Sequence, residues 1–192
     1  MFRSMIRSTI GRLGLLALAA GFSGCAPGYV TSDTSSVMLL WAAISPSPLQ
    51  SDVLTDGSIR SDNAFVALAV RFKNPNISTV PQIPSAVILE RYEIKYRRSD
   101  GKGVEGQDVP FAISGNLSQA FDVKTSGADP VTIEVVRAQA KLEPPLRNLQ
   151  HGGGALIVTM FADITIYGRT VSKEVVTTSG SLQIDFADWA DK

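Results

Sequence analysis

The chain has 192 residues, with 18 basic and 18 acidic side chains, one histidine and one cysteine. A net charge of zero gives no electrostatic case for nucleic-acid binding, which needs a basic surface to displace counterions from phosphates. A lone cysteine and a lone histidine exclude an internal disulfide, a thiolate metal site, a redox motif and a histidine cluster for zinc. We therefore expect no metal and no cofactor.

The first 24 residues have the pattern of a secretory signal. Arg3, Arg7 and Arg12 precede an uncharged apolar run from residue 13 to residue 22. A basic start followed by a short apolar run is typical of an export signal that is later removed. The run is about half of the ~20 residues that a bilayer-spanning helix needs. Three arginines and no acidic residue leave with residues 1–24, so the mature chain would carry 15 basic and 18 acidic residues, a net charge of −3.

A single cysteine, Cys25, directly follows this run, after Phe22, Ser23 and Gly24. The string resembles the bacterial lipobox, an aliphatic residue and two small residues before a cysteine, although Phe22 stands where leucine is usual. The resemblance implies that the Cys25 thiol is joined to diacylglycerol, that cleavage occurs before Cys25, and that its new amino group is acylated. Two or more acyl chains anchor a protein stably, whereas one binds only marginally. The alternative is an ordinary secretory signal with an incidental cysteine.

A chain anchored in this way would lie in the bacterial cell envelope. Ala26, rather than aspartate, follows the cysteine. By the sorting rule of enterobacterial lipoproteins this implies the outer membrane, with the domain facing the periplasm or the cell surface. The expected partners are the membrane, through the lipid on Cys25, and a protein of the envelope. Residues 25–36 are small, polar and turn-prone, which suits a flexible tether, so the folded domain is expected over residues 37–192.

Residues 37–192 have the pattern of β-strands separated by turns rich in glycine and proline. Apolar and polar side chains alternate over Ala64–Asn74 and over Ala86–Arg98, where Ile88, Tyr92 and Tyr96 fall on the apolar face. Period-two alternation indicates a strand with one face in a core and the other in water. The sequence therefore predicts an all-β, immunoglobulin-like antiparallel β-sandwich of about seven to nine strands. Further strands are expected at Val37–Ile44, Val109–Ser114, Leu117–Val123, Val131–Ala140, Leu156–Gly168 and Val171–Phe186, the last interrupted near Thr178–Gly180.

One of these strands carries a second resemblance. It ends in Asn74, Pro75 and Asn76, and a strand with Tyr92 follows it. Residues 64–96 thereby resemble the water-stress and late-embryogenesis-abundant domain, an immunoglobulin-like sandwich that also has Asn-Pro after a strand. The resemblance implies the fold, and a role in stress protection is the functional alternative that it adds.

A long connection, residues 141–154, separates two of the expected strands. Pro144 and Pro145 forbid a regular strand ladder there. Leu142, Leu146 and Leu149 are spaced four and three residues apart, which suits one helical turn that packs over an end of the sandwich. Because loops carry function disproportionately often, we name this connection as the candidate contact region.

The candidate contacts in this connection are Arg147, Asn148 and His151. His151 and the three glycines after it resemble the oxyanion loop of some lipases and esterases, but that motif also needs a Gly-x-Ser-x-Gly elbow and an α/β sheet, which the sequence does not offer. We name no catalytic residue. The first hypothesis is a lipid-anchored envelope lipoprotein that acts as a non-catalytic binding or assembly module; a carbohydrate-active or esterase-type hydrolase is the alternative.

Overall fold

The computed structural model describes residues 35–74, 76, 86–123, 127–152 and 156–189. These residues belong to one compact unit, Ser32–Lys192. The signal, the lipobox with Cys25 and most of the expected tether lie outside the described residues.

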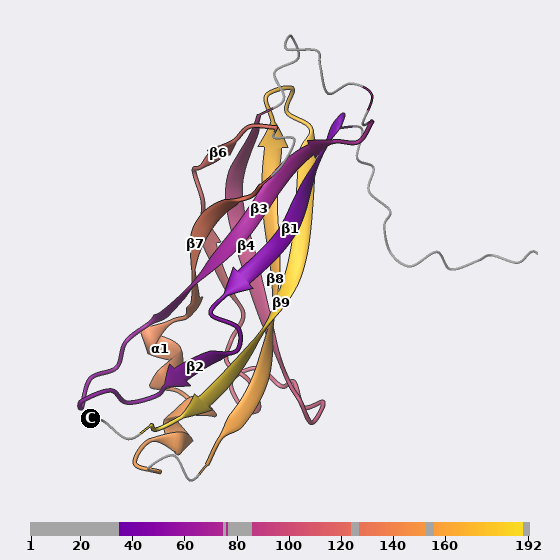
Figure 1. The fold of residues 1–192 in the computed structure, drawn as a ribbon. Coiled ribbons are helices and arrows are strands. Elements are labelled where there is room, and N and C mark those ends of the chain that lie inside the picture. The colour runs from indigo at the N-terminus through magenta and orange to yellow at the C-terminus, as the bar shows by residue number, and fades with distance from the viewer. Residues whose placement is uncertain (1–34, 75, 77–85, 124–126, 153–155, 190–192) are drawn as a thin grey trace, which may run out of the picture. The chain divides into compact units, whose positions relative to one another are not determined.

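Within the described residues, nine strands form two sheets (Figure 1). The smaller sheet has the order β1-β3-β7, and the larger has the order β2-β9-β8-β4-β5 with β6 also paired to β4. The all-β sandwich-like fold is therefore confirmed, and its immunoglobulin-like assignment stays a prediction. The strands are β1 (Val37–Ser45), β2 (Leu49–Asp52), β3 (Asp62–Phe72), β4 (Val87–Arg98), β5 (Ile113–Asn116), β6 (Ala120–Phe121), β7 (Asp129–Val136), β8 (Val158–Thr170) and β9 (Val175–Ala187).

Strand β2 corrects the expectation of a purely antiparallel sandwich. It runs parallel to β9, from Leu49 opposite Ile184 to Asp52 opposite Ala187. The other strand pairs of the two sheets are antiparallel. At four residues, β2 is too short to show an alternation, so no sequence pattern indicates it.

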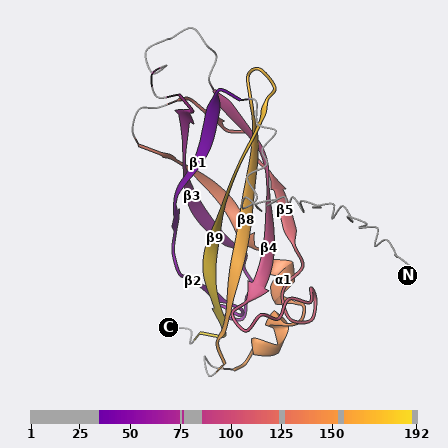
Figure 2. The ribbon, with the colours of Figure 1, turned by 90° about the vertical axis from the view of Figure 1, so that its right-hand side faces the viewer.

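The two sheets enclose one apolar core (Figure 2). Val66, Leu68 and Val70 enter it from β3, and Ile164 and Ile166 enter it from β8, all at most 1% exposed. Because inward side chains alternate with outward ones along both strands, each sheet has one dry face, as the pattern predicted.

In β4 the alternation changes phase at a bulge. Tyr92 and Tyr96 are buried as expected, but Ile88 is 46% exposed and its neighbours Val87 and Leu89 are fully buried. The register with β8 shifts between Leu89 and Arg91. A bulge inserts one extra residue into a strand, so the side chains before it face the opposite way from the expected pattern. The placement of Ile88 on the core face was therefore wrong.

The strand expected at Val109–Ser114 begins only at Ile113. Before that point the backbone folds on itself: the Val109 N–H donates to the Val104 carbonyl oxygen at 3.2 Å, and the Val109 carbonyl oxygen accepts from Gly106 at 2.8 Å. Because these groups bond within a turn, they are not available to a ladder. The expected strand over Leu117–Val123 is likewise reduced to the two residues of β6.

Strand β9 is continuous where the sequence suggested a break. Residues Thr178–Gly180 stay in the ladder, and Gly180 lies opposite Ile164. The indole of Trp41, from β1 in the other sheet, occupies the place that a side chain at Gly180 would need. The glycine is therefore required by packing between the sheets and does not mark a turn.

Two short helices cover one end of the sandwich, α1 (Ala138–Lys141) and the 3-10 helix η2 (Leu146–Leu149) (Figure 1). The strand expected to reach Ala140 ends at Val136 because Arg137 is the N-cap of α1, which begins at Ala138. Leu146 and Leu149 are buried as expected, but Leu142 is 47% exposed. Helix α1 ends before Leu142, and Lys141 takes the inward position.

Lys141 is 1% exposed, and its charge is paired inside the protein. Its Nζ lies 2.9 Å from Oδ2 of Asp62 and donates to the carbonyl oxygen of Asp52 at 2.6 Å. The hydroxyl of Ser51 donates to the same Asp62 oxygen at 2.6 Å. This polar cluster ties α1 to β2 and to the start of β3.

No helix among the described residues is long and apolar enough to cross a bilayer.

Candidate functional site

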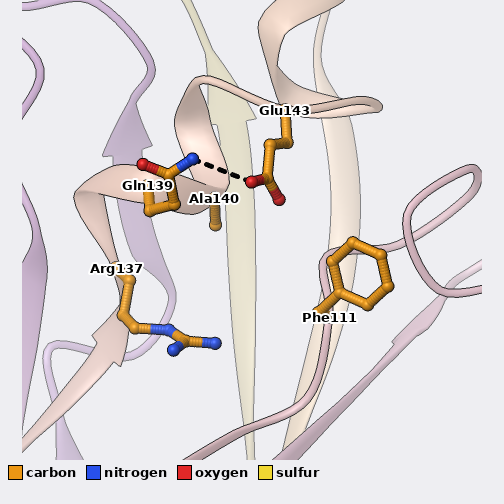
Figure 3. Close-up of a pocket in the computed structure, with 5 residues that line it drawn as sticks. All are labelled: Phe111, Arg137, Gln139, Ala140 and Glu143. Carbon is orange, nitrogen blue, oxygen red and sulfur yellow. Dashed lines mark hydrogen bonds between the residues drawn. The ribbon is translucent and has the colours of Figure 1, made fainter.

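An open pocket lies between α1 and the segment that leads into β5 (Figure 3). Its volume is about 370 Å³, and its lining residues are Phe111, Arg137, Gln139, Ala140 and Glu143. Pockets that bind small molecules commonly have about 300–1,000 Å³. The size therefore suits a small ligand or the end of a peptide.

Gln139, from α1, and Glu143, which follows the end of α1, supply the polar side of this pocket. Gln139 and Glu143 lie one turn apart, and the Gln139 amide donates from Nε2 to Oε1 of Glu143 at 2.8 Å. The hydrogen bond holds the Glu143 carboxylate in place and leaves its second oxygen turned away from Gln139 (Figure 3).

Arg137 supplies the positive charge of the pocket. It is the N-cap residue of α1, directly after β7. Its Nη2 donates a long hydrogen bond, 3.4 Å, to the carbonyl oxygen of Ala112. A guanidinium carries five N–H donors in a fixed fork, and this bond uses one of them. Arg137 therefore retains donors for an anionic group.

Phe111 supplies the apolar wall. Its ring is 51% exposed and lies against Gly106, where a Cβ would come within 2.5 Å of Cζ. Gly106 has a φ of +74°, which favours glycine. The turn that carries Gly106 thus packs against the outer end of the ring, and Phe111 also lines the pocket.

The contacts that the sequence named lie elsewhere. Arg147 and Asn148 are exposed on η2, and His151 is exposed just after it with a φ of +63°. None of the three is among the residues that line the pocket. Cys25 and the lipobox residues Phe22, Ser23 and Gly24 lie outside the described residues.

The sequence did not point to the pocket because its lining comes from two separate places in the chain. Phe111 and Arg137 are far apart in sequence and form no motif. The one available signal was a charged residue, Arg137, directly after the apolar pair Val135-Val136. It falls inside the strand that the sequence predicted over Val131–Ala140.

The outer face of the larger sheet is a less suitable site because its charges already pair with one another. Arg91 lies 3.7 Å from the ring centre of Tyr167 and bonds to Glu93, whose other oxygen accepts from the Tyr167 hydroxyl at 3.0 Å. The bond from Arg91, and then that from Tyr167, lower the pKa of Glu93.

A second pocket of about 230 Å³ opens at this face, between β4 and β5. Its one carboxylate, Glu93, is engaged as described, so this pocket offers no free acid. Within the described residues, no group of three or more histidine, cysteine, aspartate or glutamate side chains could hold a metal ion.

The comparisons with known proteins add nothing to this geometry. No protein-family model matches the chain, and no curated protein matches it either.

Proposed function

We propose that this chain is a lipid-anchored lipoprotein of the bacterial cell envelope whose β-sandwich is a non-catalytic binding module. The observation that carries the binding role is the pocket beside α1. It is open and combines a cation, a carboxylate and an aromatic ring, and its lining contains no serine, cysteine or histidine. Such a lining suits recognition better than nucleophilic catalysis.

The anchor is supported by the first 25 residues. Their basic start, short apolar run and Ser-Gly-Cys ending match an exported chain that is acylated at its only cysteine. Residues 25–36, which are small, polar and turn-prone, are the proposed tether between the anchor and the folded domain. The domain would then stand close to the membrane, with the outer membrane as the proposed location and a protein of the envelope as a proposed partner.

The hydrolase alternative has no specific observation in its favour. Glycoside hydrolysis uses two carboxylates across a cleft, whereas each of the two pockets has one, Glu143 and Glu93 respectively. A serine-type mechanism would have to use His151, which lies outside both linings. Stress protection rests on the Asn-Pro resemblance alone.

The anchor is tested by replacing its cysteine. Cys25→Ser should abolish labelling with radioactive palmitate and shift the protein from the membrane fraction to a soluble or mislocalised form. Ser23→Ala, which keeps a small residue in the lipobox, is the matched control and should label as the wild type does. Unchanged labelling and membrane retention of Cys25→Ser would refute the anchor.

The non-catalytic role is tested separately with p-nitrophenyl acetate and a set of chromogenic glycosides. The purified protein should release no chromophore above the buffer rate, and His151→Ala should not change that. Turnover that is lost in His151→Ala would favour the esterase alternative instead.

A further inference from the structure

We infer that the pocket beside α1 binds a small zwitterion with an apolar side chain, a free α-amino acid or a di- or tripeptide. The inference rests on the proposed binding function and names its ligand class. It is drawn from three groups that face one opening: Arg137, Glu143 and Phe111 (Figure 3).

The two charges approach the opening from different sides. In Figure 3, Arg137 extends from the start of α1 below Ala140, and Glu143 descends from the residues after α1. A guanidinium matches a carboxylate with two parallel N–H donors. A carboxylate accepts well from an ammonium group. A ligand with both a carboxylate and an ammonium therefore satisfies both sides.

The presence of both charges also provides selectivity. A simple anion would be attracted by Arg137 but repelled by the carboxylate of Glu143. A simple cation would be attracted by Glu143 but repelled by Arg137. Placing a like charge in a site is a common means of rejecting wrong partners. Neither Arg137 nor Glu143 takes part in an ion pair among those that the structure gives for its described residues, so both charges remain for a ligand.

Phe111 sets the preference for an apolar side chain. Half of its surface is exposed in the free protein. Covering apolar surface is favourable, so a leucine-sized side chain against the ring adds affinity. The pocket volume of about 370 Å³ is of the size that one to a few residues would fill.

The test is isothermal titration calorimetry on the full-length protein purified in a mild detergent. The probes are L-leucine and L-leucyl-L-leucine, with N-acetyl-L-leucine and L-leucinamide as analogues that each lack one charge. At least one zwitterion should bind, and both analogues of leucine should bind about tenfold more weakly or worse, because each loses a charge-assisted hydrogen bond. The two zwitterions distinguish a free amino acid from a peptide.

Two variants and two matched controls locate the site. Arg137→Gln and Glu143→Gln should each weaken binding of the zwitterion about tenfold or more. Arg60→Gln, an exposed arginine between β2 and β3 that does not line the pocket, and Glu174→Gln in the β8–β9 turn, at the opposite end of the sandwich (Figure 1), should leave it unchanged. Far-ultraviolet circular dichroism confirms that each variant is folded.

If neither L-leucine nor L-leucyl-L-leucine binds at ~10 mM, well above the millimolar dissociation constants of weak sites, the inference is overturned. Equal binding of all four probes, or binding that ignores both Arg137→Gln and Glu143→Gln, would overturn it as well. None of these results affects palmitate labelling at Cys25, so failure of the ligand class is distinguishable from failure of the proposed anchor.

Discussion

The hydroxyl of Tyr96 donates a hydrogen bond of 2.7 Å to the carbonyl oxygen of Val135. Tyr96 lies on β4 and Val135 on β7, so this bond crosses the core from the larger sheet to the smaller one. Tyr92, on the same face of β4, donates to the carbonyl oxygen of Glu134 at 3.2 Å. Two tyrosines thus fill the core and also fix how the sheets lie against each other.

Removing the Tyr96 hydroxyl should destabilise the fold. Tyr96→Phe leaves the buried Val135 carbonyl oxygen without this donor, which costs about 1–3 kcal/mol in the free energy of unfolding. Tyr167→Phe is the matched control, since its hydroxyl bonds to Glu93 on the outer face. Urea denaturation should show the larger loss in Tyr96→Phe, and equal losses would contradict the role of the cross-sheet bond.

Stability should fall at alkaline pH because of the same residue. Burial raises the pKa of Tyr96 above its ordinary value. Above about pH 10, the pKa of an exposed tyrosine, the unfolded chain loses this proton while the folded chain keeps it, so stability decreases as pH rises. Tyr96→Phe should therefore show a shallower decline in unfolding free energy between about pH 10 and 12. An identical slope in the wild type and the variant would count against this assignment.

Gly180 should not tolerate even a methyl group. A Cβ there would overlap the indole of Trp41, and overpacking a core typically costs about 1–3 kcal/mol. Gly180→Ala should also change the near-ultraviolet circular dichroism as Trp41 moves. Gly103→Ala is the control, because nothing lies within 4 Å of its Cβ position. A stable Gly180→Ala with an unchanged spectrum would show that the two sheets pack differently here.

Lys141 should be needed for stability despite its charge. Lys141→Met leaves Asp62 without its cation, and breaking a buried ion pair from one side costs about 3–5 kcal/mol; the lower end applies because Asp62 is 19% exposed. The exposed Lys102→Met should stay within about 0.5 kcal/mol of the wild type. Thermal and urea unfolding measure both. If Lys141→Met leaves the free energy of unfolding unchanged, solvent already screens the pair of Lys141 and Asp62.

Alternation along the strands made most of the sheets predictable. The segments at Ala64–Asn74 and Ala86–Arg98 correspond to β3 and β4, because one face of each must be apolar to enter the core. The phase change before Arg91 was not predictable, since a bulge depends on the partner strand. Strand β2 was missed for a similar reason, because its parallel partner β9 lies far along the chain.

The candidate site was less predictable than the sheets. The connection after β7 was rightly expected to cover an end of the sandwich, and Leu146 and Leu149 are buried there. The residues chosen in that connection, Arg147, Asn148 and His151, are exposed but do not line the pocket. Phe111 and Arg137 line the same pocket only because the turn before β5 and the start of α1 lie at the same edge of the fold. No local sequence pattern indicates this arrangement.

We propose that lipid on Cys25, the only cysteine of the chain, holds the protein at a membrane. Mass spectrometry of the protein isolated from bacterial membranes tests this most directly. We expect a mature chain that begins at Cys25 and carries the added mass of a diacylglyceryl group and an N-terminal acyl chain. A chain that retains residues 1–24, or one whose Cys25 has a free thiol, would contradict it.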